Sequence, residues 1–244
     1  MIGFITVRSA SSRLKEKIFL NFGKFNVLGH VIERLRTYSI DPLVCTTNSK
    51  DDIKIIEIAD KHNCKYFRGS ERNKIKRWLD CANTFNIETF HTVDCDDPFF
   101  CGEMMHESMG VLLKSNLDYV SPNERSNEGS GEVGYSINRK FLRKLNCVED
   151  DNKDTEMVDM YFKQKLADYK EYISTNKFKS KYRLTLDYKE DYWLLRTIVE
   201  ILGQNPSREE IDELFYKNPD LHKINYFRNL AWKQKQIKQN SNQI

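Results

Sequence analysis

The chain has 244 residues and a formal net charge of +3 at pH 7. Its length suits one large domain, and its near-balanced charge gives no reason to expect a nucleic acid or a membrane surface as partner. No apolar run reaches the length of a transmembrane helix, and the first residues lack a signal-peptide pattern. The six cysteines form no CxxC pair and no zinc spacing. We therefore expect a cytoplasmic protein with reduced, buried thiols.

The first half of the chain alternates strand-like and helix-like segments. Apolar patterns predict strands at residues 3–7, 42–47, 64–67, 87–93 and 118–120. They predict helices at residues 27–35, 50–62, 71–84 and 102–113. This order predicts an α/β fold with a mostly parallel, twisted sheet and helices on both faces. Ligands bind such sheets at the carboxyl ends of the strands.

The pattern is looser in the second half. Residues 123–132 are rich in Asn, Ser, Gly and Glu, which predicts a surface loop. A strand at 183–186 and helices at 189–202 and 207–216 are predicted beyond it. The Gln-, Lys- and Asn-rich tail from Lys233 is expected to fray.

The predicted elements suggest a division of the chain into two parts. Residues 1–202 contain all the predicted strands, and we expect them to form the main domain. Residues 203–244 contain a helix and the polar tail, so we expect a C-terminal helical extension.

The loop after the first strand carries the most distinctive chemistry. The segment from Val7 to Lys17 holds four cations, Arg8, Arg13, Lys15 and Lys17, together with three serines. Serine hydroxyls and backbone N–H groups can donate to phosphate oxygens, while Arg and Lys neutralise the charge. The spacing favours a polyphosphate ligand slightly over a solvated basic turn.

Carboxylates follow two of the later strands. Asp94, Asp96 and Asp97 come directly after Val93, and Asp187 follows the strand at 183–186. Because the carboxyl ends of parallel strands share one edge of a sheet, we expect these groups to meet the basic loop. Carboxylate oxygens and phosphates together suit Mg²⁺. The alternative is that each Asp caps a helix or forms a turn; we favour the metal for Asp96, and for Asp187 alone both stay open.

These motifs, taken in order, resemble those of cytidylyltransferases of the spore-coat polysaccharide type. That family is related to the enzymes that activate 3-deoxy-octulosonate and sialic-type sugar acids as CMP conjugates. Its opening, Ala-Arg-x-x-Ser-Ser-Arg-Leu-Pro-Gly-Lys, is matched here by Arg8, Ser11, Ser12, Arg13, Leu14 and Lys17. Its Gly-Asp-x-Pro loop falls on residues 95–98, and its late Leu-Thr-Val-Asp-x-x-Glu-Asp motif on residues 184–191.

The resemblance implies a Rossmann-like nucleotidyltransferase that transfers CMP from CTP to an acidic sugar and releases pyrophosphate. It also implies Mg²⁺ as cofactor, a homodimer, and a role in surface polysaccharide or glycoconjugate biosynthesis. Asp96 and Asp187 would hold the metal, and Arg8, Arg13 and Lys17 would stabilise charge on the phosphates. The other implied nucleotide contacts are Ser11, Ser12, Thr46, Thr47, Gly69, Ser70 and Arg77. Those implied for the acceptor are Asp94, Asp97 and Glu156.

The chain departs from the family pattern in several places. The family's Pro-Gly is Lys15-Glu16, its glycine before the metal aspartate is Cys95, and its Arg-Glu-His-Val-Thr-Pro is replaced by residues 155–160. Two other classes of function therefore stay open. One is a glycosyltransferase of similar build that uses residues 94–96 as a D-x-D metal motif. The other is a paralogue that binds a nucleotide without turnover.

Overall fold

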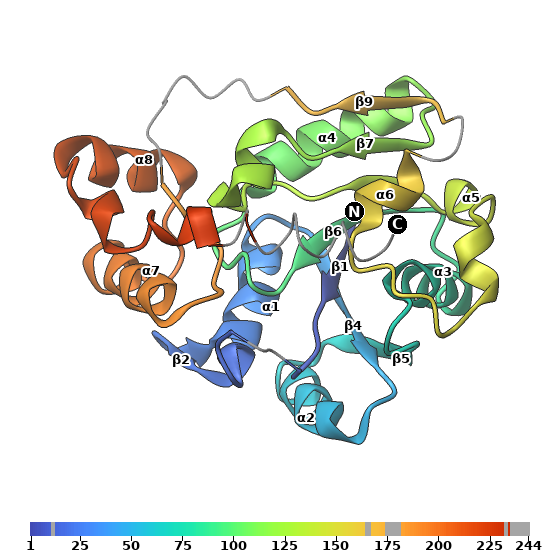
Figure 1. Cartoon of the computed structure of the whole chain (residues 1–244), viewed down its shortest axis with the longest axis horizontal. Helices are drawn as coiled ribbons and strands as arrows, with labels where there is room; N and C mark the ends of the chain where they lie inside the picture. Colours follow the sequence, from blue (N-terminus) through green and yellow to red (C-terminus); the bar gives the residue numbers. More distant parts are fainter. Residues whose placement is uncertain (11–12, 164–166, 174–181, 232–233, 235–244) are drawn as a thin grey trace.

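A seven-stranded sheet forms the centre of the molecule, with the strand order β5-β4-β1-β6-β8-β7-β9 (Figure 1). The computed structural model describes residues 1–10, 13–163, 167–173, 182–231 and 234. The strands of the sheet are β1 (Ile2–Thr6), β4 (Asp41–Thr47), β5 (Lys65–Gly69), β6 (Thr89–Asp94), β7 (Tyr119–Ser121), β8 (Ser136–Asn138) and β9 (Tyr169–Glu171). β8 runs antiparallel to β6 and β7, and the other neighbouring pairs are parallel. The predicted α/β fold with a mostly parallel sheet is confirmed.

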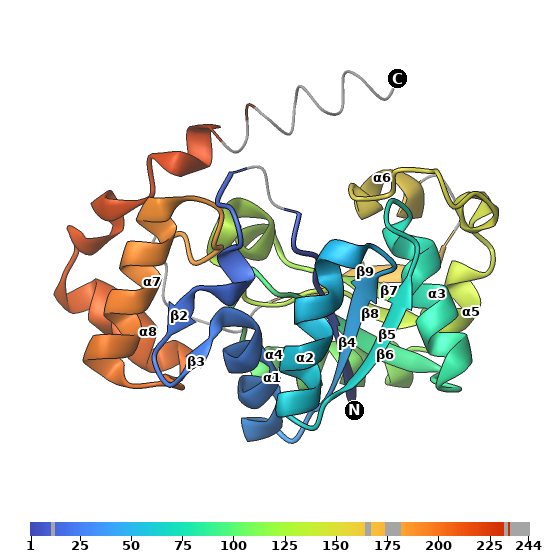
Figure 2. The ribbon, with the colours of Figure 1, turned by 90° about the horizontal axis from the view of Figure 1, so that it is seen from below.

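Helices cover both faces of this sheet (Figure 2). They are α1 (Val27–Thr37), α2 (Ile53–Lys61), α3 (Lys74–Thr84), α4 (Gly102–Lys114), α5 (Arg139–Leu142), α6 (Val158–Phe162), α7 (Lys189–Leu202) and α8 (Arg208–Lys217). The alternation of side chains along β1 explains the two layers, because successive residues of a strand point to opposite faces. Ile5 packs in one apolar cluster with residues of α1, α2, α4 and α7, and Phe4 packs in another with residues of α3, α5 and α6.

The C-terminal elements extend the first of these clusters. α7 has the predicted bounds, and α8 begins one residue after the predicted start. Ser207 and Glu210 form a capping box there, in which each side chain accepts a hydrogen bond from the other residue's backbone N–H. Ile211 and Phe215 of α8 are buried among the same apolar residues as Ile5. The predicted fraying tail lies almost wholly outside the described residues.

Two predicted elements are wrong. Residues 183–186 form no strand; this extended segment donates from Leu184 and Thr185 to the carbonyl of Gly129, and from Leu186 to the carbonyl of Asp96. Residues 123–132 are not a plain surface loop either. They contain a helical turn, η3 (Ser126–Ser130), and end in a fully buried residue, Glu132, because buried donors from elsewhere in the chain pair with that carboxylate.

Sequence patterns gave no sign of several short elements. These are the hairpin of β2 (Asn21–Phe22) and β3 (Phe25–Asn26), the strands β8 and β9, and the 3-10 turns η1 (Lys17–Phe19), η4 (Asn146–Glu149) and η5 (Leu221–Ile224); the turn η2 (Lys50–Asp52) forms the start of the helix predicted at residues 50–62. Each has at most four residues, too few for a periodic pattern to stand out. Among the helices that the structure describes, none is both long and apolar enough to cross a membrane.

Candidate active site

A cavity of about 540 Å³ opens at the carboxyl ends of β1 and β6. Its walls come from the loop after β1, the loop after β6, the N-terminal part of α3, and three later segments around Gly131, Glu156 and Asp187. Ligands usually bind parallel sheets at this edge, in the crevice outside the carboxyl ends of the strands where the strand order reverses.

Three charged side chains meet in this cavity. Lys17 Nζ lies 2.7 Å from Asp96 Oδ2 and 3.0 Å from Asp187 Oδ1. It also donates to the backbone carbonyl of Leu186 at 2.8 Å. The Asp187 side chain is 1% exposed and that of Lys17 is 11% exposed, whereas Asp96 is 27% exposed. The expected meeting of the basic loop with the two aspartates is therefore seen, and one ammonium group touches both carboxylates.

The charges of this cluster stabilise one another. Burial opposes the charge on Lys17, but the carboxylates of Asp96 and Asp187 outweigh it and hold the pKa of Lys17 above its ordinary value. Burial also opposes ionisation of Asp96, and Lys17 outweighs it in turn, so the pKa of Asp96 is lowered. Arg13 adds a second cation, with Nη2 2.6 Å from Asp187 Oδ1. Lys17 and Asp96 therefore favour the charged form of each other, and Arg13 and Asp187 lie in contact with the same cluster.

The turn that precedes Lys17 contains a residue in a left-handed conformation. Glu16, the residue at the family's glycine position, has φ 52° and ψ 26°. This left-handed conformation favours glycine and costs other residues about 1–2 kcal/mol. The carboxylate of Glu16 points to Lys54, 3.5 Å away, and both side chains are about two-thirds exposed. The turn before Lys17 therefore carries local backbone strain at Glu16.

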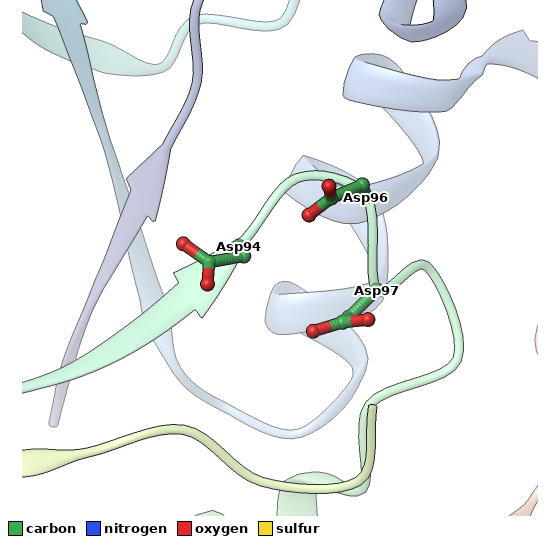
Figure 3. Close-up of side chains that lie close together, drawn as sticks. All are labelled: Asp94, Asp96 and Asp97. Carbon is green, nitrogen blue, oxygen red and sulfur yellow. The ribbon is translucent and has the colours of Figure 1, made fainter. Parts of the chain in front are cut away.

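Asp94 and Asp97 lie beside Asp96 on the loop that leaves β6 (Figure 3). One carboxylate oxygen from each of the three lies within 4.8 Å of the others, a spacing that could hold a metal ion. Asp97 accepts a hydrogen bond from Thr185 Oγ1 at 2.7 Å. Burial, together with the charges of its two neighbours, raises the pKa of Asp97 to about 8. Burial and the neighbouring carboxylates thus oppose ionisation of Asp97, whereas Lys17 favours ionisation of Asp96.

Alternating charges line the other end of the cavity. Lys74 Nζ lies 2.9 Å from Asp94 Oδ1 and 4.0 Å from Glu156 Oε1, above the ring of Trp78. Arg8 Nη2 lies 3.4 Å from Glu156 Oε2. Asp94 and Glu156 are about half exposed, so these ion pairs are accessible from the cavity. The sequence gave no sign of Lys74, because a lysine in the first turn of a helix is most often solvated.

Arg77 also lines the cavity, and it is 2% exposed. Its Nη1 donates to the carbonyl of Ser70 at 2.6 Å, and its Nε has no hydrogen-bond partner among the residues that the structure describes. Arg77 is therefore not a solvated side chain of α3. A buried guanidinium with so few partners is suited to an anionic ligand.

The structure does not bring four of the predicted nucleotide contacts into this cavity. The hydroxyls of Thr46 and Thr47 both donate to Asp52 Oδ2. Gly69 and Ser70 line a separate hollow beyond β5. Nucleotide contacts at these four positions stay a prediction, and Ser11 and Ser12 lie outside the described residues.

Asp52 is a residue of this region that sequence reasoning missed. It is 1% exposed, and its Oδ1 accepts from the backbone N–H of Ser9 at 2.7 Å and from the Ser9 hydroxyl at 2.6 Å. Because its other oxygen binds the two threonines of β4, Asp52 fastens the start of the Arg8–Lys17 loop to the sheet. In the sequence it was indistinguishable from an ordinary acidic residue near a helix start.

Comparison with known proteins agrees with this geometry. A family model described as cytidylyltransferase matches residues 2–237. The chain belongs to the cytidylyltransferase family. It is 26% identical over 230 residues to the spore coat polysaccharide biosynthesis protein SpsF of Bacillus subtilis, a match that covers 88% of this chain and 94% of that protein. It is also 32% identical over 123 residues to an uncharacterized protein of Methanocaldococcus jannaschii, covering about half of the length of each.

Solved structures of cytidylyltransferases have the same fold. A cytidylyltransferase from Leptospira borgpetersenii superimposes with a TM-score of 0.78 at 28% identity, over 91% of this chain and 96% of that one. CMP:2-keto-3-deoxy-manno-octonic acid synthetase, in a complex with CTP, superimposes with a TM-score of 0.59 at 12% identity, over 82% of this chain and 98% of that one. The second likeness concerns the fold alone.

Proposed function

We propose that this cytidylyltransferase transfers CMP from CTP to a hydroxyl group of an acidic sugar and releases pyrophosphate. The observation that carries the proposal is the meeting of Asp96 and Asp187 at Lys17, with Arg13 beside them. Nucleotidyl transfer needs the phosphate to be held in line with the attacking oxygen and its charge to be neutralised. A cluster of cations and carboxylates in one cavity provides both.

The residues around Lys17 fit a Mg²⁺ ion. Mg²⁺ prefers carboxylate and phosphate oxygens, and Asp96 and Asp187 offer carboxylates from two distant parts of the chain. Both already turn an oxygen toward a positive charge, the ammonium of Lys17. A bound Mg²⁺ would polarise the α-phosphate and lower the pKa of the attacking hydroxyl.

The cations of the loop would then act on the triphosphate. Arg13 and Lys17 would exchange their carboxylate partners for phosphate oxygens as the nucleotide enters, and would stabilise the pyrophosphate as it leaves. Arg8 is 43% exposed and lies nearer Glu156, so it would meet charge at the α-phosphate or at the acceptor. Arg77, with its unsatisfied Nε, would contribute a further contact to an anion.

The acceptor would occupy the end of the cavity lined by Lys74, Asp94 and Glu156. Lys74 and Arg8 are cations that could pair with a sugar carboxylate, and Asp94 and Glu156 could accept hydrogen bonds from its hydroxyls. The name of the Bacillus subtilis relative supports surface polysaccharide or glycoconjugate biosynthesis as the setting. The family resemblance further supports a cytoplasmic location and a homodimer. Light scattering would test the homodimer.

The direct test is pyrophosphate release from CTP, UTP, ATP and GTP, each with Mg²⁺ and a panel of sugar acids. We expect release with CTP and one class of acid, and none after the metal is removed with a chelator. Release from another nucleotide in preference to CTP would overturn the assignment of the nucleotide. Binding of CTP without turnover on any acid would instead favour the non-catalytic alternative.

The family match favours cytidylyl transfer over the glycosyltransferase alternative. Thermal unfolding with CTP and with UDP-sugars separates the two directly. We expect CTP to raise the unfolding temperature in the presence of Mg²⁺. Stabilisation by the nucleotide sugars alone would support the glycosyltransferase.

A further inference from the structure

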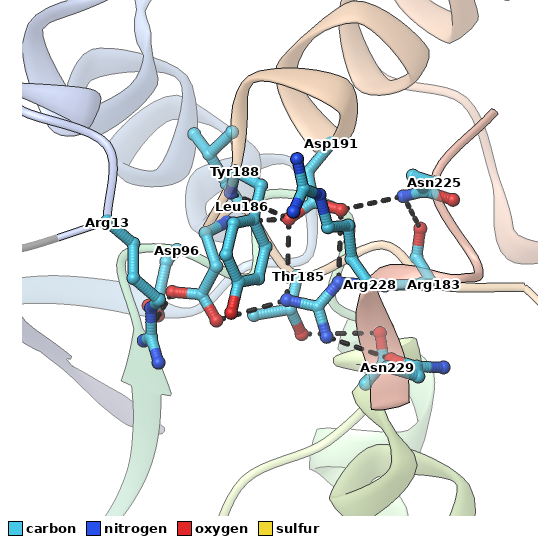
Figure 4. Close-up of polar contacts among 12 residues, drawn as sticks. Arg13, Asp96, Arg183, Thr185, Leu186, Tyr188, Asp191, Asn225, Arg228 and Asn229 are labelled. Carbon is cyan, nitrogen blue, oxygen red and sulfur yellow. Dashed lines mark hydrogen bonds and ion pairs between the residues drawn. The ribbon is translucent and has the colours of Figure 1, made fainter. Parts of the chain in front are cut away.

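A buried network contacts Asp187 on the side away from Lys17, and Figure 4 shows its members Arg183, Asp191, Asn225 and Asn229. Arg183 is fully buried, and its Nη2 lies 3.0 Å from Asp187 Oδ2. The same guanidinium donates two hydrogen bonds to Asp191, from Nε to Oδ1 at 3.0 Å and from Nη2 to Oδ2 at 3.3 Å. Its Nη1 donates to Asn229 Oδ1 at 2.9 Å. Every side of this guanidinium therefore has a partner, so its orientation is fixed.

Asp191 fixes the backbone of the same segment. It is fully buried, and its Oδ2 accepts hydrogen bonds from the backbone N–H groups of Asp187 and Tyr188, both at 2.9 Å. Asn225 donates to Asp191 Oδ1 at 2.9 Å and to the carbonyl of Arg183 at 2.9 Å. The network thus ties the start of α7 and residues 225–229 near the C-terminus to the main chain at Asp187.

The two oxygens of Asp187 consequently have different surroundings. Oδ2 is bound by Arg183 from behind, while Oδ1 faces the cavity, where it meets Arg13 and Lys17. A carboxylate without the rear contact could rotate about its side chain and offer either oxygen, or both, to the cavity. With the contact from Arg183, Asp187 presents only Oδ1 to the cavity, in one orientation.

We propose that Arg183, held by Asp191 and Asn229, is the positioning residue that aims Asp187 at the divalent cation. The inference rests on the proposed function, in which Asp187 holds that cation. Groups that hydrogen-bond to a metal-binding carboxylate typically change metal affinity by 10–100-fold when they are replaced. The contacts of Arg183 place it in that position relative to Asp187.

A purely structural role makes a different prediction. Buried ion pairs are weak stabilisers overall, but removing one partner destabilises the fold because the other charge is left buried. A structural role therefore predicts lower stability of the variant with an unchanged affinity for metal. The two roles are separated by measuring metal binding and stability in the same variants.

The test uses Arg183→Lys, which keeps the positive charge but carries all its donors on one nitrogen, so it cannot reproduce the planar fork of three nitrogens that reaches Asp187, Asp191 and Asn229. Mn²⁺ binding in the presence of a non-hydrolysable CTP analogue is followed by electron paramagnetic resonance, and unfolding by urea denaturation. We expect Arg183→Lys to weaken Mn²⁺ binding about tenfold or more. Asn229→Ala removes one hydrogen-bond partner of the guanidinium without removing a charge, and it should also weaken Mn²⁺ binding. This variant keeps the test decisive if Arg183→Lys does not fold.

Arg208→Lys is the matched control. Arg208 is 1% exposed and pairs with the buried Glu132 at 3.0 Å, but it touches neither Asp96 nor Asp187. It should lose comparable stability and bind Mn²⁺ as the unaltered protein does. Equal Mn²⁺ affinity in the Arg183, Asn229 and Arg208 variants would overturn the inference while leaving the proposed function intact. An unaltered protein that binds neither Mn²⁺ nor the analogue would overturn the proposed function, and the inference with it.

Discussion

Asp96 and Asp187 come from distant parts of the sequence, yet each places a carboxylate oxygen within 3.0 Å of the same nitrogen, Nζ of Lys17. The contact between their segments is made by the backbone as well, since the N–H of Leu186 donates to the carbonyl of Asp96 at 2.7 Å. This backbone contact brings the two segments together, and Lys17 neutralises the repulsion between their carboxylates.

Replacing either aspartate should abolish turnover. We expect Asp96→Asn and Asp187→Asn each to reduce pyrophosphate release from CTP by several orders of magnitude, because an amide is a poor ligand for Mg²⁺ and leaves the α-phosphate less polarised. Asp118→Asn is the control and should have normal turnover. Asp118 directly precedes β7, does not line the cavity, and pairs with Lys144. Near-normal release by both site variants would remove the metal assignment.

Removing the ammonium group between the aspartates should change the response to metal. In Lys17→Met the two carboxylates face each other without a cation, so the free energy of unfolding should fall in the absence of metal. Mg²⁺ alone should then raise the unfolding temperature of this variant more than that of the unaltered protein, because no ammonium competes for the site. Lys15→Met, an exposed cation of the same loop, should behave like the unaltered protein. An equal Mg²⁺ response in all three proteins would contradict a shared cation site.

Relief of the strained turn before Lys17 should stabilise the protein. Glu16→Gly allows the positive φ without a steric cost, although glycine is more flexible in the unfolded chain. We expect a net gain of about 0.5–1 kcal/mol in the free energy of unfolding. Glu16→Ala removes the exposed pair with Lys54 but keeps the strain, and should gain nothing. If both variants have the same stability, the backbone at position 16 carries no strain.

Asp52 should matter for CTP binding although it lies outside the cavity. Asp52→Asn weakens the hydrogen bonds that hold Ser9 to β4, so the Arg8–Lys17 loop should be less well fixed. We expect a loss of about 1–3 kcal/mol in stability and a higher KM for CTP, with a smaller effect on kcat. Asp51→Asn, the exposed neighbour, should change neither. An unchanged KM in Asp52→Asn would mean that the loop is held by other contacts.

Asp52 should also contribute to the dependence of the free energy of unfolding on pH below neutrality. Burial raises the pKa of Asp52, but the hydrogen bonds from Ser9 and Thr47 outweigh it, and the net effect lowers the pKa. A group whose pKa is lower in the folded state adds stability above its unfolded pKa of about 3.9, and that stability is lost as the pH falls through the folded value. Urea denaturation from pH 7 to pH 3 should therefore show a shallower decline for Asp52→Asn. A parallel decline in both proteins would contradict the lowered pKa.

Sequence patterns predicted the fold where periodicity and caps agree. α7 and α8 were predicted to within one residue from their apolar spacing, and in the structure a capping box of Ser207 and Glu210 marks the start of α8. Residues 183–186 misled because Leu184 and Leu186 alternate with polar residues like a strand, while their backbone partners are Gly129 and Asp96 rather than a strand. That choice depends on tertiary contacts that no local pattern contains.

The site was predictable only where its residues follow strands of the sheet. The loop after β1 and Asp96 were placed correctly because both follow strands of one parallel sheet. Asp187 reaches the same edge without following a strand, through the backbone contact to Asp96. Asp52 and Lys74 were not predicted, because the partners Ser9 and Asp94 lie far from them in the sequence. Arg183 was missed although Asp187 and Asp191 lie within eight residues of it, because residues 183–186 were predicted to form a strand.

The central claim is that Asp96 and Asp187 bind one divalent cation together with the triphosphate. It is tested most directly by a crystal structure with Mn²⁺ and a non-hydrolysable CTP analogue, in which anomalous scattering locates the metal. We predict one Mn²⁺ coordinated by an oxygen of Asp96, an oxygen of Asp187 and the α-phosphate, with Lys17 moved onto the phosphates. A metal bound by Asp94 and Asp97 without Asp187, or a triphosphate away from the Arg8–Lys17 loop, would contradict the account.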